Sequence, residues 1–264
     1  MNHAVLVLDA GDMGSAVAHA LHGAGFGVAM ADDPAPSHPR RGMAFADALW
    51  DGHAHLAGLD AVRIDSSTAL AEQLARREAV AITALPMPDV FSAVTWYALV
   101  DARMRKRTTP PDRRGLVSLS IGLGVGFAAG TNCDLPIETS WDALGQVARA
   151  GATLPLRGEP RTIAGVGRER AVYAPVERVV RTGLRIGDRV LAGEPFLDLD
   201  GVVLRAPLPG VLRGLVRDGV RVAPGAKVLE VDPRGQPEHC YGLGERPRGV
   251  ALGVLAAIGV HSRL

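Results

Sequence analysis

The turn over residues 9–15, with the sequence DAGDMGS, contains the first residues that could do chemistry. It approximates the dinucleotide fingerprint G-x-G-x-x-G, with Asp9, Gly11 and Gly14 in the glycine positions. Gly11 permits close approach of the backbone to a phosphate, and a helix beginning near Asp12 offers free N–H groups. Asp9 and Asp12 put negative charge where a pyrophosphate would lie. Two interpretations stay open: a nucleotide or pterin site, or a structural strand-to-helix turn.

A basic segment follows a strand predicted over residues 96–104. Open α/β sheets bind ligands at the carboxyl ends of their strands, and guanidinium groups bind phosphate in bidentate fashion while lysine adds a point charge. The segment predicts an anion site, with a solvated basic loop as the alternative. Arg40 and Arg41, after an earlier strand, are candidates for the same ligand. The basic residues of the segment are Arg103, Arg105, Lys106 and Arg107.

The next predicted strand ends in the sequence GLGVGFAAG. Gly122, Gly124 and Gly126 make a loop whose backbone could approach a flat or anionic ligand closely. The alternative is that these glycines only permit tight turns. Because this loop should leave the same edge of the sheet as the first glycine turn, we favour a binding role.

A strand–helix–strand unit must position these residues. Residues 4–8 form an apolar run, apolar residues then recur at helical spacing up to Gly25, and residues 27–33 have the pattern of a second buried strand. Asp32 and Asp33 end this strand. Either could accept a ribose hydroxyl, and a solvated loop acid is the alternative.

Further strands are predicted over residues 79–85, 96–104 and 116–127, with a helix over residues 67–77 that Ser66 or Ser67 could cap. Strands that alternate with helices indicate a parallel sheet covered on both faces. The fold class is therefore predicted as α/β, with a Rossmann-like parallel sheet domain over residues 1–160.

One sequence pattern occurs twice, at residues 174–200 and again at residues 206–232, with an offset of 32 (206 minus 174). The copies share the proline after the first alanine and glycines at equivalent positions, for example Gly187 with Gly219. Two copies are too few for a solenoid, so they should interlock into one compact β-domain with pseudo-twofold symmetry. We predict this domain over residues 161–235, followed by a tail with a helix over residues 236–264.

The repeat resembles the barrel-sandwich hybrid domains of biotin and lipoyl carriers. In those carriers a lysine between the halves is acylated by the cofactor. This chain has the sequence LDLDGVVLRAP at that place, and no lysine lies between Pro160 and Ala226. A swinging-arm role is therefore excluded.

Histidines and cysteines give weaker signals. His19 and His22 share a helix and His53 and His55 share a strand face, yet neither pair has a third ligand nearby in the sequence. We predict no metal site. Cys133 and Cys240 are expected to be inert, partly buried thiols, and no catalytic residues can be assigned.

The composition narrows the class of protein. The 264 residues are 47% hydrophobic and carry a formal net charge of +1, which gives no general attraction to nucleic acid or anionic membranes. Two cysteines make no disulfide framework, the first residues have no signal-peptide pattern, and no apolar run approaches the ~20 residues that span a bilayer. We expect a cytoplasmic protein without a membrane or nucleic-acid partner, and a homo-oligomer is an open possibility.

Several blocks together resemble the YqeB-like accessory proteins of selenium-dependent molybdenum hydroxylases across nearly the whole chain. These blocks are GDMGSAVAHALHGAGFGVAM, RRGMAFADALWDG, LVDARMRKR, IGLGVGFAAGTNCDLPIET, the paired AP repeat and VDPRGQPEHC. The chain looks like a divergent member, since Asp9 and Val125 replace residues usual in the family. The resemblance implies a maturation or cofactor-handling role for a molybdenum enzyme.

The preferred hypothesis is thus an accessory factor that binds a phosphate-bearing ligand, molybdopterin or a nucleotide, and contacts a molybdenum enzyme client. The ligand residues would be Gly11, Asp12, Gly14, Asp32, Arg40, Arg41, Arg105, Lys106, Arg107, Gly122, Gly124 and Gly126. An NAD(P)-dependent oxidoreductase and a non-catalytic docking module are the alternatives. The broken fingerprint and the lack of a positioned general base favour a non-enzymatic role.

Overall fold

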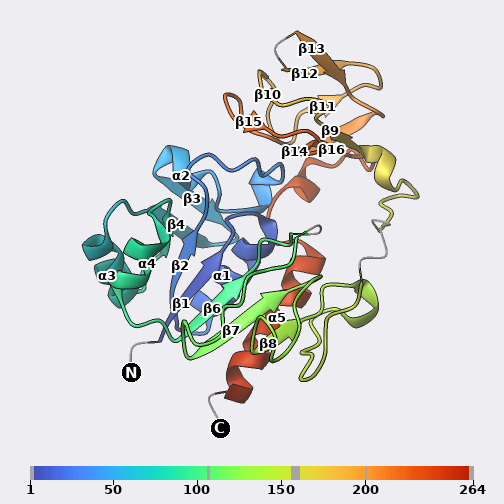
Figure 1. The fold of residues 1–264 in the computed structure, drawn as a ribbon. Coiled ribbons are helices and arrows are strands. Elements are labelled where there is room, and N and C mark those ends of the chain that lie inside the picture. Colours follow the sequence, from blue (N-terminus) through green and yellow to red (C-terminus); the bar gives the residue numbers. More distant parts are fainter. Residues whose placement is uncertain (1–2, 106–107, 156–160, 200, 262–264) are drawn as a thin grey trace.

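The protein is described here by a computed structural model that covers residues 3–105, 108–155, 161–199 and 201–261 (Figure 1). An eight-stranded sheet with the order β3-β4-β5-β2-β1-β6-β7-β8 forms the larger unit. All neighbouring strands in it are parallel except the hairpin β3–β4 at one edge. Its strands are β1 (Ala4–Leu8), β2 (Gly27–Ala31), β3 (His53–Leu56), β4 (Leu59–Arg63), β5 (Val80–Thr83), β6 (Ala98–Asp101), β7 (Leu119–Leu123) and β8 (Leu135–Ile137).

Helices cover both faces of this sheet (Figure 1). Successive side chains of β1 alternate between the faces, so Val5 and Val7 pack in one core and Leu6 packs in the other. Both faces are apolar because both are covered, which is the pattern of a parallel sheet. The helices of this unit are α1 (Asp12–Gly23), α2 (Ala48–Asp51), α3 (Ser67–Arg76), α4 (Met87–Ala93) and α5 (Glu245–His261).

The last helix, α5, returns to the first unit after the chain has left it. Its buried residues Val250 and Val254 belong to the same core as α1 and β7. Gly253 lets the helix approach the loop after β8, because a Cβ there would overlap the carbonyl oxygen of Gly145. The C-terminal segment thus packs on the α/β unit.

A smaller antiparallel β unit stands beside the sheet (Figure 1). It contains a four-stranded sheet, β11-β14-β16-β9, and the pairs β10–β15 and β12–β13. The unit has an apolar core of its own around Val180, Leu212 and Val228. Its strands are β9 (Ala171–Tyr173), β10 (Arg178–Val179), β11 (Arg189–Val190), β12 (Pro195–Leu199), β13 (Val202–Arg205), β14 (Gly210–Leu215), β15 (Arg221–Val222) and β16 (Lys227–Asp232).

The two copies of the sequence repeat exchange contacts in this unit. Val179 of the first copy pairs with Arg221 of the second, in antiparallel strands. The equivalent positions in the opposite copies are Val211 (179 plus 32) and Arg189 (221 minus 32), and these two residues pair in the same way. The offset also relates two backbone hydrogen bonds of 2.8 Å, from the Gly193 N–H to Ala206 and from the Gly225 N–H to Ala174. Each copy therefore supplies strands that pair with the other.

The structure confirms the α/β class with additional antiparallel sheets. It adds the antiparallel edge hairpin β3–β4, which the expectation of a parallel sheet did not include. The boundaries at residues 160 and 235 stay predictions, and residue 160 lies outside the described residues. Within the ranges given above, no helix is both long enough and apolar enough to cross a bilayer.

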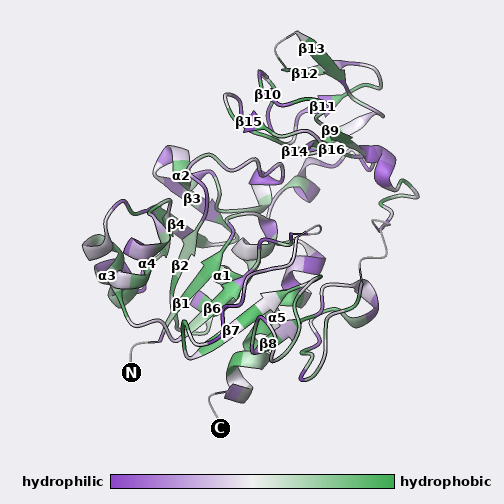
Figure 2. Ribbon diagram, in the orientation of Figure 1, coloured by the Kyte–Doolittle hydropathy of each residue, from purple (hydrophilic) through white to green (hydrophobic). Residues whose placement is uncertain are grey.

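The hydropathy colouring in Figure 2 follows this division. The strands at the centre of the large sheet are strongly hydrophobic. Polar groups join the two units. The Leu215 N–H donates to Pro39 at 2.7 Å, the Arg41 Nε donates to the Leu215 carbonyl at 2.9 Å, and Arg217 pairs with Asp51 at 2.6 Å.

Candidate functional site at the carboxyl edge of the sheet

The order of the strands reverses beside β1. The chain runs from β1 to β2 on one side, whereas β6 pairs with the other side of β1. Such a switch point opens a crevice at the carboxyl ends of the strands, where open α/β sheets bind their ligands. Asp9 follows β1, Asp32 follows β2 and Arg103 follows β6, so these side chains meet at one edge.

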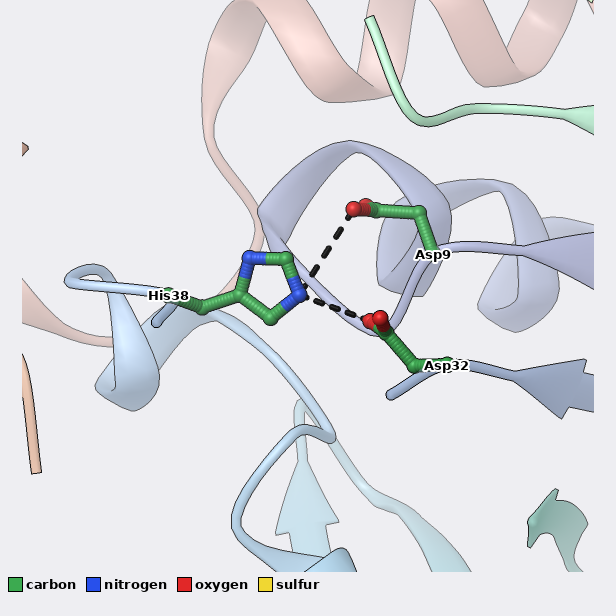
Figure 3. A group of neighbouring side chains, drawn as sticks. All are labelled: Asp9, Asp32 and His38. Atoms are coloured by element: carbon green, nitrogen blue, oxygen red, sulfur yellow. Dashed lines mark hydrogen bonds and ion pairs between the residues drawn. The ribbon is translucent and has the colours of Figure 1, made fainter. Parts of the chain in front are cut away.

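Asp9, Asp32 and His38 converge at this edge (Figure 3). The Nε2 atom of His38 lies 2.7 Å from Asp32 Oδ2 and 3.6 Å from Asp9 Oδ1. One ligand atom from each of the three residues lies within 4.8 Å of the others. We call these three residues the edge triad.

The edge triad is half-buried, and burial perturbs its proton affinities. Burial raises the pKa of Asp9 to about 7; the positive charge of His38 opposes this rise, and the negative charges of Asp32 and Asp12 add to it. Burial alone would lower the pKa of His38, but the hydrogen bond with Asp32 and the charge of Asp9 raise it to about 9. His38 is therefore an imidazolium between two carboxyl groups at neutral pH.

Backbone amides hold both carboxyl groups in place. Asp32 accepts hydrogen bonds from the N–H groups of Ala10 at 2.6 Å and Asp33 at 2.8 Å. Asp9 Oδ2 accepts the Gly11 N–H at 3.0 Å, and the other oxygen, Oδ1, faces His38. The amide of Gly11, which the sequence offered to a phosphate, is thus already bonded to a carboxylate.

Gly11 and Gly14 are required by packing within the turn. A Cβ at Gly11 would lie 2.9 Å from Nδ1 of His38, and a Cβ at Gly14 would overlap the carbonyl oxygen of Asp9. Asp9 itself has a φ of 116°, a conformation that L-residues rarely adopt. The glycines therefore allow α1 and residue 38 to crowd against Asp9.

Asp12 and Arg40 belong to an ion network that joins the two units. Arg40 donates to Asp12 at 2.8 Å and, through two nitrogens at 3.0 Å each, to the buried Glu230 of β16. Lys227 and Arg170 also reach Glu230, at 2.7 and 3.3 Å. Burial would raise the pKa of Glu230, but Arg40 and Lys227 hold it well below its usual range. Arg40 is therefore bound within the protein, as is Arg41 at the junction.

Three arginines gather on the β6 side of the same edge. Arg103 donates to Asp101 through Nε at 2.8 Å and through a second nitrogen. Burial lowers the pKa of Arg113, and the positive charges of Arg103 and Arg105 lower it further. The Arg113 Nε is buried and has no hydrogen-bond partner among the described residues. We call Arg103, Arg105 and Arg113 the arginine cluster. Lys106 and Arg107 lie outside the described residues.

The glycine loop after β7 packs against neighbouring side chains of the protein. A Cβ at Gly122 would overlap the ring of Phe127, while Gly124 and Gly126 have φ values of 80° and 92°. The side-chain amide of Asn132 donates to the backbone carbonyl of Gly126 at 2.9 Å. The backbone carbonyl of Asn132 accepts the backbone N–H of Arg113 at 3.1 Å. The loop thus supports the segment that carries Arg113. A direct ligand role of its glycines stays a prediction.

The histidine pairs and the cysteines take no part in this edge. His19 and His22 contact the carbonyl oxygens of Ala57 and Arg77 at 3.2 and 3.0 Å, and His55 contacts Asp60 at 2.7 Å. Burial raises the pKa of the thiols to about 12 for Cys133 and about 11 for Cys240, so both stay protonated at neutral pH.

The chain is 33% identical over 257 residues to the uncharacterized protein YqeB of Escherichia coli (strain K12). The match takes in 96% of this chain. The chain is YqeB-like. Its 33% identity agrees with a divergent member, and the chain spans about half, 47%, of the length of this curated relative. No family model matches the chain.

Two parts of this YqeB-like edge were missed in the sequence. The sequence pattern of Asp9 indicated a replaced glycine and a negative charge near a pyrophosphate, and not a partner of Asp32. His38 was not predicted, although it follows Asp32 by six residues in the segment DDPAPSHPRR. Arg113 was not singled out from the basic segment. Proximity to Asp32 was the signal for His38, but only the return of residues 34–38 toward β1 makes the contact.

Proposed function

We propose that this YqeB-like protein is an accessory or maturation factor for a molybdenum-dependent hydroxylase. It binds a phosphate-bearing ligand, molybdopterin or a nucleotide, at the carboxyl edge of its sheet, in the cytoplasm. The family resemblance supports the molybdenum enzyme as client, and the arrangement of charge at the edge supports the ligand class.

The arginine cluster is the observation that carries the ligand class. The positive charges of Arg103 and Arg105 lower the pKa of Arg113, and an anion bound between these arginines would relieve that repulsion. Guanidinium groups bind phosphate oxygens in bidentate fashion. Arg105 is exposed and Arg113 has an unpaired buried Nε. Both can donate to a phosphate without breaking an ion pair. Arg103 alone is already occupied, by Asp101.

The edge does not favour an NAD(P)-dependent oxidoreductase. In the dinucleotide motif the pyrophosphate lies against the glycine turn at the start of the first helix. Here Asp9 occupies the first glycine position and accepts the Gly11 N–H itself. The ligand would therefore lie on the β6 side of the crevice, toward Arg105 and Arg113.

We further propose that the β unit is a barrel-sandwich hybrid domain that serves as a docking surface for the client. The exchanged pairing of the two repeat copies supports a pseudo-twofold β-domain. Leu191 is 71% exposed and Val203 is 49% exposed. Exposed aliphatic side chains on a β unit are suited to protein contact.

A thermal-shift experiment tests the ligand class. The full chain is heated with CTP, GTP, NADH or molybdopterin, and with inorganic pyrophosphate as the shared chemical group. A ligand that binds only the folded state at about 100 times its Kd stabilises the protein by about 2.7 kcal/mol, so Tm rises. Replacing Arg105→Ala and Arg113→Ala together should reduce the rise in Tm and make the remaining rise less dependent on salt.

Arg76→Ala is the matched control, because Arg76 is an exposed arginine of α3 that pairs only with Glu72 in the contacts described. It should leave the ligand-induced rise in Tm unchanged. No rise with any of these ligands, or an equal rise in the double variant and the wild type, would overturn the proposed ligand site.

A further inference from the structure

We propose that the edge triad, Asp9, Asp32 and His38, is a binding site for one divalent first-row transition-metal cation. The proposal does not depend on the phosphate ligand or on the client enzyme. It rests on the donor set, its geometry, the way that the protein holds the donors, and their place in the fold.

The donor set suits such an ion. Two carboxylate oxygens and one imidazole nitrogen are offered by three side chains. Imidazole suits zinc, iron, nickel and copper, whereas carboxylates suit magnesium, calcium and manganese. A mixed set with three protein ligands fits Mn²⁺ or Zn²⁺, and leaves further coordination positions for water or a ligand oxygen.

The two distances from His38 to the carboxylate oxygens lie on either side of the range expected for adjacent metal ligands. Ligands that each lie about 2.1 Å from a metal are about 3.0 to 3.4 Å apart when neighbours in an octahedron or a tetrahedron. His38 Nε2 lies 2.7 Å from Asp32 Oδ2 and 3.6 Å from Asp9 Oδ1. The three side chains converge in Figure 3, and small movements of them would allow one ion to lie between all three.

The protein holds the donors in the manner of a metal site. Ligating carboxylates are commonly oriented by hydrogen bonds from outside the first coordination layer. The N–H groups of Ala10 and Asp33 fix Asp32, and the Gly11 N–H fixes Asp9 by one oxygen while the other faces His38. Gly11 has no Cβ that would press on the imidazole.

The location is a second, independent observation. The edge triad flanks the switch point between β1 and β6, where α/β sheets bind ligands. Asp9 and Asp32 follow adjacent strands, and His38 comes from the segment that leads to the junction with the β unit.

Isothermal titration calorimetry of the full, metal-free chain with MnCl₂ and, separately, ZnCl₂ tests the proposal. One ion should bind per chain. Asp9→Asn and His38→Gln should each weaken the binding at least tenfold, in line with the loss of one ligand. Circular dichroism and the Tm of each variant without metal show whether it is folded.

His55→Gln is the matched control, because His55 contacts Asp60 at the same 2.7 Å but lies on the exposed hairpin β3–β4. It should bind the ion as the wild type does. Wild-type protein that binds neither ion, or a folded His38→Gln variant with unchanged affinity, would overturn the metal site. Neither outcome depends on the arginine cluster, so a failure here is distinct from a failure of the proposed function.

Discussion

At the scale of single residues, the most consequential feature is the crowding around Asp9. Its carboxyl group lies among His38, Asp32 and the first turn of α1, and its backbone carbonyl lies against Gly14. The residue occupies the position of the first glycine of the dinucleotide fingerprint, yet it keeps a positive φ. Asp9 thus adopts a backbone conformation that is usual for glycine while it carries an acidic side chain.

Gly14→Ala should destabilise the protein by about 1 to 3 kcal/mol, because the new Cβ overlaps the Asp9 carbonyl and forces the backbone to shift. Urea unfolding at neutral pH measures the change. Gly23→Ala in the same helix is the control, because a Cβ there has open space, and it should be neutral or stabilise by up to about 1 kcal/mol. Equal effects of the two substitutions would contradict the packing role of Gly14.

At the scale of elements, β16 concentrates the buried charge of the β unit. Glu230 and Asp232 are fully buried, and each is neutralised by basic side chains. Burial would raise the pKa of Asp232, but hydrogen bonds from Arg234 and Arg213 lower it to about 2. One strand thus depends on its ionised carboxylates.

The stability of the β unit should therefore fall in acid. The folded-state pKa of Asp232 is depressed, so its contribution is complete above the unfolded value of 3.8 and is lost as the pH falls toward 2. The contribution is on the order of 2 kcal/mol. Urea unfolding between pH 5 and pH 2 should show a shallower decline for Asp232→Asn than for wild type.

Asp60→Asn serves as the control for this pH dependence, since Asp60 is exposed on the hairpin β3–β4. Its unfolding profile should decline as steeply as that of the wild type. A wild-type profile that is flat below pH 4, or one that Asp232→Asn does not alter, would contradict the role assigned to the buried charge.

The elements were well predicted where local pattern decides them. The run at residues 4–8 is β1, Ser66 caps α3 by accepting the Ala69 N–H at 3.2 Å, and the strand predicted over residues 79–85 contains β5. The strand expected at His53 and His55 is β3, but its hairpin with β4 was not predicted, because the exposed faces of these strands lack an apolar pattern. Short α4 was missed for a similar reason, since its seven residues give little periodicity.

The site was predictable only in outline. The sequence indicated the carboxyl edge of the sheet and the arginines after β6. It did not indicate that Arg40 would form an ion pair with Glu230, a residue 190 positions away. Nor did it indicate that Asp9 would accept the Gly11 N–H. Such pairings depend on how distant segments meet, and local sequence patterns do not contain that information.

At the scale of the whole molecule, the segment that contains His38, Pro39, Arg40 and Arg41 connects the two units. His38 joins the edge triad, Pro39 accepts the Leu215 N–H, and Arg40 binds Glu230. Pro39, Arg40 and Arg41 therefore tie the β unit to the same short segment that carries His38 to the carboxyl edge of the sheet.

A crystal structure of the full chain grown with inorganic pyrophosphate tests most directly whether the carboxyl edge is a phosphate site. The account predicts pyrophosphate density in contact with Arg105 and Arg113, on the β6 side of the crevice. Pyrophosphate bound elsewhere on the protein, with no density beside these two arginines, would contradict it.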